Sequence, residues 1–96
     1  PRRSVFGPPR SFVVSGDWPD GEVADVVPAR YAVVVARRLR AAMVGRSLRD
    51  VAAEADLDHT TVWAVLRGER WPDLVTLPKL EVALGVRMWP DEPPVG

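Results

Sequence analysis

The segment "DLDHTTVWAVLRG", residues 56–68, places polar side chains at the start of an apolar helical pattern. Thr60 can donate or accept a hydrogen bond, and His59, the only histidine of the chain, can donate to an acceptor or an anion. Trp63 adds an aromatic ring one turn further along. Together these groups could recognise a partner through hydrogen bonds and ring contacts, which requires a helix whose opposite side is held by a core.

The chain offers no matching set of residues for catalysis or metal binding. It contains no cysteine, and one histidine makes an imidazole-rich metal site very unfavourable. The acidic cluster of Asp17, Asp20, Glu22 and Asp25 has no nucleophile, metal ligand or phosphate loop beside it. We interpret these acids as solvent-facing turn residues, and we expect neither an enzyme nor a cofactor.

The tripeptide Trp-Pro-Asp occurs three times, at 18–20, 71–73 and 89–91. Unequal spacing argues against a structural repeat. A loop of this sequence supplies the general acid of protein tyrosine phosphatases, but their nucleophile is a cysteine, which this chain lacks. A small hydrolase is therefore excluded.

The 96 residues suit one small domain, and their net charge of zero conceals an uneven distribution. Residues 26–72 carry eight arginines against five acids, a net of +3, whereas residues 73–96 have a net of −2. Arginine suits bidentate contacts with phosphate or guanine. Because a GC-rich genome explains arginine usage equally well, composition alone does not decide the partner.

Helical periodicity begins after Pro28 and predicts four helices. The first covers roughly residues 29–44, and its Arg37, Arg38 and Arg40 are interpreted as a solvated face. Ser47 is a predicted N-cap for "LRDVAAEA", and Asp58 is a predicted N-cap for "HTTVWAVLR", which Gly68 ends. The fourth helix runs from about Thr76 to Leu84, with Pro78 in its first turn.

A short helix, a tight turn and a second helix with a polar leading edge are typical of helix-turn-helix DNA binding. The apolar side of the second helix, Val62, Val65 and Leu66, is expected to face the core. Its outer surface then carries His59, Thr60, Trp63, Ala64 and Arg67. We therefore predict that this surface reads bases in the major groove.

The segment "SLRDVAAEADLDHTTVWAVLRGERWPDLVTLPKLEVALGV" resembles the lambda-repressor-like (Cro/XRE) helix-turn-helix regulators. The resemblance runs from about Val35 to Val86, and the family's ordered frame maps without gaps. It covers the capped second helix, the turn at 56–58, the recognition helix, Gly68, Pro72 and a leucine-rich helix. The resemblance implies an all-α, four-helix domain at 28–90, between an N-terminal extension at 1–27 and a tail at 91–96.

Three features depart from the family pattern. Asp56 replaces the usual turn glycine, although aspartate tolerates a left-handed backbone better than most residues. Leu66 replaces a frequent glutamate, and could serve packing or a partner surface. The family's usual last helix is missing, which leaves the N-terminal extension as an alternative dimer contact.

The resemblance also implies which side chains touch DNA. Base contacts carry over to His59, Thr60, Trp63 and Ala64, and phosphate contacts are expected from Ser47, Arg49, Arg67 and Arg70. Two alternatives stay open: His59 as an ordinary solvated residue of the first turn, and Trp63 as a core or dimer-interface residue.

Residues 1–27 contain the β-prone runs "SFVV" and "EVADVV" around the turn-like "SGDWPDG". A β-hairpin and an irregular, disordered arm are both compatible with this pattern. We expect the extension to assist dimerisation or DNA contact through Arg2, Arg3 and Arg10.

The predicted function is that of a sequence-specific, double-stranded DNA-binding transcriptional regulator. By family analogy it is a repressor, and we expect it to act as a homodimer. No apolar run approaches the length of a membrane span and no signal-peptide pattern appears, so we expect a cytoplasmic protein that involves no membrane. The alternative is a protein-interaction or antitoxin-like module that uses the same surface to bind a protein partner.

Overall fold

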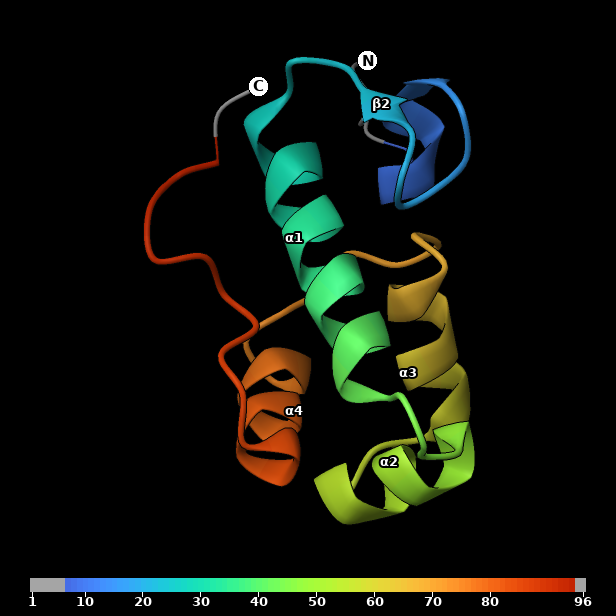
Figure 1. Cartoon of the computed structure of the whole chain (residues 1–96), viewed down its shortest axis with the longest axis vertical. Helices are drawn as coiled ribbons and strands as arrows, with labels where there is room; N and C mark the ends of the chain where they lie inside the picture. Colours follow the sequence, from blue (N-terminus) through green and yellow to red (C-terminus); the bar gives the residue numbers. More distant parts are fainter. Residues whose placement is uncertain (1–6, 95–96) are drawn as a thin grey trace, which may run out of the picture.

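A computed structural model describes residues 7–94 and contains four α-helices and one hairpin (Figure 1). The helices are α1 (Val27–Ala42), α2 (Leu48–Ala55), α3 (His59–Leu66) and α4 (Thr76–Leu84). A 3-10 turn (Pro9–Phe12) leads into strands β1 (Val13–Ser15) and β2 (Glu22–Val23). The predicted all-α fold with an N-terminal hairpin extension is confirmed.

The hydrophobic core lies where α1 meets the three shorter helices. Each helix contributes the side chains that recur at helical spacing on its inner face. The core residues are Val35, Leu39, Val51, Ala52, Ala55, Val62, Val65, Leu77, Leu80, Leu84 and Met88. This core holds α3 against its neighbours by one side and leaves the other side free.

The two predicted caps begin α2 and α3. Ser47 Oγ accepts the Asp50 N–H at 3.0 Å, and Asp58 Oδ1 accepts the Thr60 N–H at 3.0 Å. Each cap satisfies an N–H group that has no partner within its helix. Between the helices Asp56 adopts φ 57°, the left-handed conformation expected where the family has glycine. Local sequence signals therefore set the helix-turn-helix geometry.

Asp73 caps the N-terminal end of α4, although the regular helix starts at Thr76. Its Oδ1 accepts the backbone N–H groups of Val75 and Thr76, at 3.1 and 2.7 Å, and its carbonyl accepts the Leu77 N–H at 2.9 Å. Pro78 is the third residue of the regular helix and so lies in its first turn, as predicted.

The N-terminal extension forms an antiparallel hairpin, so the disordered-arm alternative is wrong for the described residues from Gly7 onward. Val13 pairs with Val23, and Ser15 pairs with Glu22. The 3-10 turn before it packs Phe12 edge-on against Trp71, with ring centroids 6.0 Å apart. Trp71 also donates its indole N–H to the Gly7 carbonyl at 3.1 Å, which ties the extension to the loop before α4.

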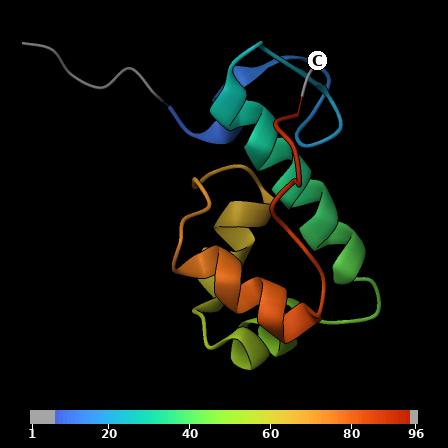
Figure 2. The same ribbon diagram turned by 90° about the vertical axis from the view of Figure 1, so that its left-hand side faces the viewer.

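After α4 the chain continues without a further helix as far as residue 94, and it runs back alongside α1 (Figures 1 and 2). Arg38 of α1 donates to the carbonyls of Arg87 and Trp89, each at 3.2 Å. The Trp89 ring packs on Tyr31 with centroids 5.2 Å apart, and Met88 is fully buried. The segment that follows α4 thus lies against α1.

Within residues 7–94, no helix combines the length and apolar character needed to cross a membrane.

Candidate nucleic-acid interface

Helix α3 presents a mixed surface opposite its buried side. Val62 and Val65 are buried in the core, whereas Trp63 is 45% exposed. Thr60, Ala64 and Arg67 follow one another at spacings of four and three residues, which places them on one face of the helix. His59 and Trp63 are four residues apart, as are Thr60 and Ala64, so the helix also brings the four predicted base-contacting residues together on adjacent rows of its surface. The core interpretation of Trp63 is wrong for the single chain.

The Asp58 carboxylate fixes the hydrogen bonding of Thr60. Asp58 Oδ1 accepts both the Thr60 N–H, at 3.0 Å, and the Thr60 hydroxyl, at 2.9 Å. The Thr60 N–H foremost, and the hydroxyl after it, hold the pKa of the Asp58 carboxyl below its usual value, so the carboxylate form is favoured. Because the hydroxyl proton is already donated, Thr60 faces a partner with free acceptor lone pairs.

His59 occupies the first position of α3 and is partly exposed. Its Nδ1 lies 3.7 Å from Asp58 Oδ1, beyond hydrogen-bonding distance. The imidazole can thus donate to a base acceptor or a phosphate. The contacting role of His59 and its alternative as a solvated first-turn residue both stay predictions.

Trp63 and Arg67 form a pair on the exposed side of α3. The Arg67 guanidinium carbon lies 5.3 Å from the Trp63 ring centroid, a cation–π distance. Glu69 Oε2 accepts from Arg67 Nε at 3.3 Å and lies 3.2 Å from Arg10 Nη1. These contacts orient Arg67 over the ring while leaving its side chain 46% exposed.

The predicted phosphate contacts cluster at helix ends and exposed loops. Ser47 accepts from Asp50, so its hydroxyl proton stays free to donate to an anion. Arg49 is exposed and has no ion-pair partner within residues 7–94. Arg70 NH2 lies 3.7 Å from Asp73 Oδ2, a weak surface contact that a phosphate could displace.

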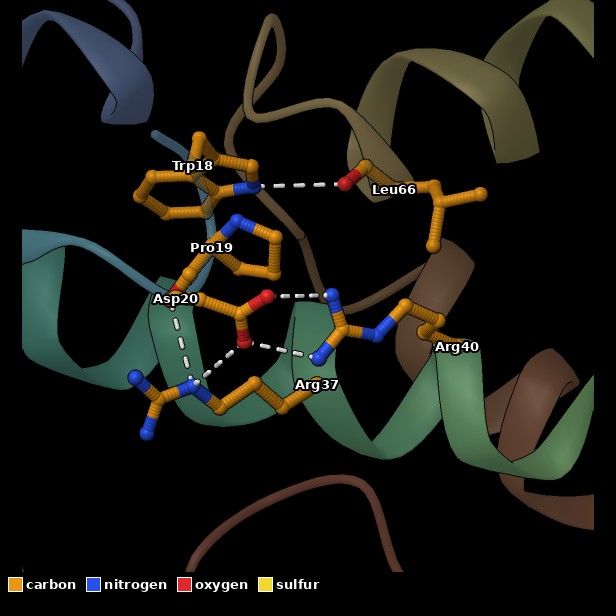
Figure 3. Close-up of polar contacts among 6 residues, drawn as sticks. All are labelled: Trp18, Pro19, Asp20, Arg37, Arg40 and Leu66. Atoms are coloured by element: carbon orange, nitrogen blue, oxygen red, sulfur yellow. Dashed lines mark hydrogen bonds and ion pairs between the residues drawn. The ribbon is translucent and has the colours of Figure 1, made fainter. Parts of the chain in front are cut away.

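Leu66 packs against the core, which favours the packing interpretation of this departure from the family pattern. Its carbonyl oxygen accepts the Trp18 indole N–H at 3.2 Å (Figure 3). Neither this contact nor that between Asp20 and Arg40, whose atoms approach to 2.8 Å, could be read from the sequence. One signal for the contact with Arg40 was present in the sequence: residues 17–25 contain acids and no bases, whereas the first predicted helix is rich in arginine.

Arg37, Arg38 and Arg40 of α1 are exposed, as predicted, but they are not merely solvated. Arg37 donates to the Pro19 carbonyl at 3.1 Å, and Arg40 makes two hydrogen bonds to Asp20. Arg2 and Arg3 lie outside the described residues. Among residues 7–94, no three metal-ligating side chains converge on a possible metal site.

Residues 37–88 match the model of a helix-turn-helix protein family. The crystal structure of the restriction-modification controller protein C.AhdI from Aeromonas hydrophila is similar, with 34% identity and a TM-score of 0.54. The alignment covers 58% of this chain and 88% of the controller protein. The hypothetical transcription factor NHTF from Neisseria is 28% identical, with a TM-score of 0.58 and coverage of 73% and 87%. No curated protein matches the sequence.

Proposed function

The chain belongs to the Cro/C1-type helix-turn-helix family of regulators, and from this premise we propose that it is a sequence-specific repressor that reads double-stranded DNA with α3. The observation that carries the proposal is the division of α3 into a fully buried side and an exposed side with hydrogen-bonding groups. A helix fits the major groove, where each base pair presents a distinct pattern of donors and acceptors.

Within this proposal, the side chains of α3 make different kinds of contact with DNA. Thr60 accepts from an exocyclic amino group of adenine or cytosine, because its own proton is donated to Asp58. His59 donates to a guanine acceptor or a phosphate. The exposed Trp63 ring and the Ala64 methyl make apolar contacts with a thymine methyl or a sugar.

Phosphate contacts then set the position of α3 without reading sequence. We assign them to Ser47 and Arg49 at the start of α2, and to Arg67 and Arg70 at the end of α3. The first-turn N–H groups of α2 other than that of Asp50 have no side-chain cap, so they can also bind a phosphate oxygen.

We further propose a homodimer on a two-fold-related DNA site. An apolar face remains uncovered on and beside α4, where Leu74 and Val82 are each 84% exposed and Val75 is 64% exposed. Val75, Pro78 and Val82 follow helical spacing, so they form one stripe. Exposed apolar stripes of this kind mark association surfaces, and a second copy can bury the stripe against itself.

The salt dependence of binding to a labelled duplex tests DNA binding against the protein-interaction alternative. Each phosphate contact releases counterions, so the logarithm of the affinity should fall steeply with the logarithm of the salt concentration. Arg67→Ala should weaken binding to all sequences alike and reduce the slope by about one unit. Arg87→Ala is the matched control, because Arg87 pairs with Asp91 in the tail.

Retention of the wild-type protein on DNA without salt dependence would contradict the proposal. So would an Arg67→Ala loss confined to one preferred sequence, because a phosphate contact carries no base preference.

A further inference from the structure

The loop Trp18–Asp20 of the N-terminal hairpin joins α1 to the end of α3 (Figure 3). This loop lies outside residues 37–88, the range that the family model matches. It carries one of the three Trp-Pro-Asp tripeptides whose role the DNA-binding assignment does not explain.

On the α3 side, the loop satisfies a carbonyl that the helix leaves without a partner. Leu66 is the last residue of α3, and the last carbonyls of a helix have no intrahelical donors. The Trp18 indole N–H donates to the Leu66 carbonyl at 3.2 Å. The backbone N–H of Arg10, from the same extension, donates to the Gly68 carbonyl at 2.8 Å.

The Trp18 ring also lies directly on Gly68. A Cβ atom added to Gly68 would stand 2.6 Å from Trp18 Cε2, and Gly68 has φ +71°. The close approach of the ring and the left-handed backbone thus both require glycine here. The extension packs on the point where α3 ends, so the two cannot move independently.

On the α1 side, the loop is held by two arginines. Arg40 makes a bidentate interaction with Asp20, with distances of 2.9 and 2.8 Å, and Arg37 donates to the Pro19 carbonyl at 3.1 Å. Pro19 is buried between these contacts. Bidentate arginine–carboxylate pairs fix orientation as well as distance.

The same loop borders one proposed base contact, Trp63, and one proposed phosphate contact, Arg67. A cleft of about 530 Å³ is lined by Trp18 and Pro19 on one side and by Trp63 and Arg67 on the other. A shift or rotation of the C-terminal half of α3 would therefore displace Trp63 and Arg67 relative to α1.

We propose that the Trp18–Asp20 loop is a positioning device that fixes the C-terminal half of α3 for base discrimination. Trp18 acts as a positioning residue through Leu66 and Gly68, and Asp20 acts through Arg40. The inference rests on the proposed function, since it assigns to the extension a role in how α3 reads DNA.

Trp18→Phe and Asp20→Asn test the device, because the first removes the indole donor and the second removes the charge that holds Arg40. The other Trp-Pro-Asp tripeptide at 89–91 supplies matched controls, Trp89→Phe and Asp91→Asn, since Trp89 packs on Tyr31 and Asp91 pairs with Arg87. Each protein is assayed for the ratio of its affinities for the preferred duplex and for single base-pair variants. Amide hydrogen exchange at Arg67, Gly68 and Glu69, which bond back to residues 63–65, reports the end of α3 directly.

We expect both test variants to lower the affinity ratio by at least about fivefold, which is the smallest discrimination that one good base contact provides. We also expect them to speed hydrogen exchange at these three amides. The controls should change neither quantity. Faster exchange with an unchanged affinity ratio would reduce the loop to a structural cap and overturn the inference, as would no change in either measurement. If the Trp18→Phe protein does not fold, the Asp20→Asn protein alone tests the inference, because Asp20 is exposed. A wild-type protein without preference for any duplex would instead refute the proposed function itself.

Discussion

At the scale of single residues, Thr60 carries the most specific chemical consequence. Under the proposed function, its hydroxyl donates to Asp58 and its lone pairs accept from an amino group of adenine or cytosine in the major groove. Thr60→Val keeps the shape and removes the acceptor. We expect a loss of about 1–3 kcal/mol on the preferred site and a relaxed preference at one base pair, measured by competition with site variants.

Thr61→Val is the control for this change, because it alters the neighbouring threonine in the same turn. The melting temperature of Thr60→Val separates a binding effect from loss of the α3 cap. A folded Thr60→Val protein that keeps every base preference would refute the role assigned to Thr60.

At the scale of the elements, α2 depends on its cap. Ser47 Oγ accepts the Asp50 N–H, and the carboxylate of Asp50 lies in the first turn, where the helix dipole favours it. Ser47→Ala should lower the free energy of unfolding by about 1 kcal/mol in denaturant titrations. Ser15→Ala, in the exposed hairpin, is the control and should have little effect. Equal stability of both variants would mean that the Ser47 cap contributes nothing.

The capping carboxylates and the carboxylate of Asp20 also make the fold sensitive to acid. The Thr76 N–H foremost holds the pKa of Asp73 below its usual 3.8, and hydrogen bonds from Thr60 and Arg40 lower the pKa values of Asp58 and Asp20. A lowered folded-state pKa contributes stability that is fully present above the unfolded pKa. That stability is lost as the pH falls through the folded value.

The melting temperature should therefore lose these contributions only below about pH 4. Asp73→Asn keeps an acceptor for the cap but cannot titrate, so it should lose less stability than wild type on acidification. Identical acid-induced losses in the two proteins would contradict this explanation.

The helix-turn-helix elements could be predicted from sequence because their signals are local. Ser47 and Asp58 cap helices within three residues of themselves, and Asp56 sits in the turn it shapes. The contacts of the extension could not be predicted in this way. Trp18 and Leu66 are 48 residues apart and Asp20 and Arg40 are 20 apart, so only the packed chain brings them together.

At the scale of the whole molecule, the proposed homodimer makes a prediction about the apolar stripe of α4. Val82 is 84% exposed in the apolar stripe of α4, so a single chain tolerates a charge there. Val82→Glu should shift the protein toward monomer in sedimentation and weaken binding to a two-fold site. Val44→Glu, at a residue 82% exposed in the turn after α1, is the matched control. A dimer that withstands Val82→Glu but dissociates on removal of the extension would place the interface there instead.

Selection of binding sites from random duplex DNA tests the central claim most directly. A dimer that reads the major groove with α3 should enrich a two-fold-symmetric sequence whose half-sites lie about 10 base pairs, or a multiple of this, apart. In the same selection, Thr60→Val should lose the preference at one position of each half-site. Failure of the folded wild-type protein to enrich any sequence would contradict the assignment of α3 as a recognition helix.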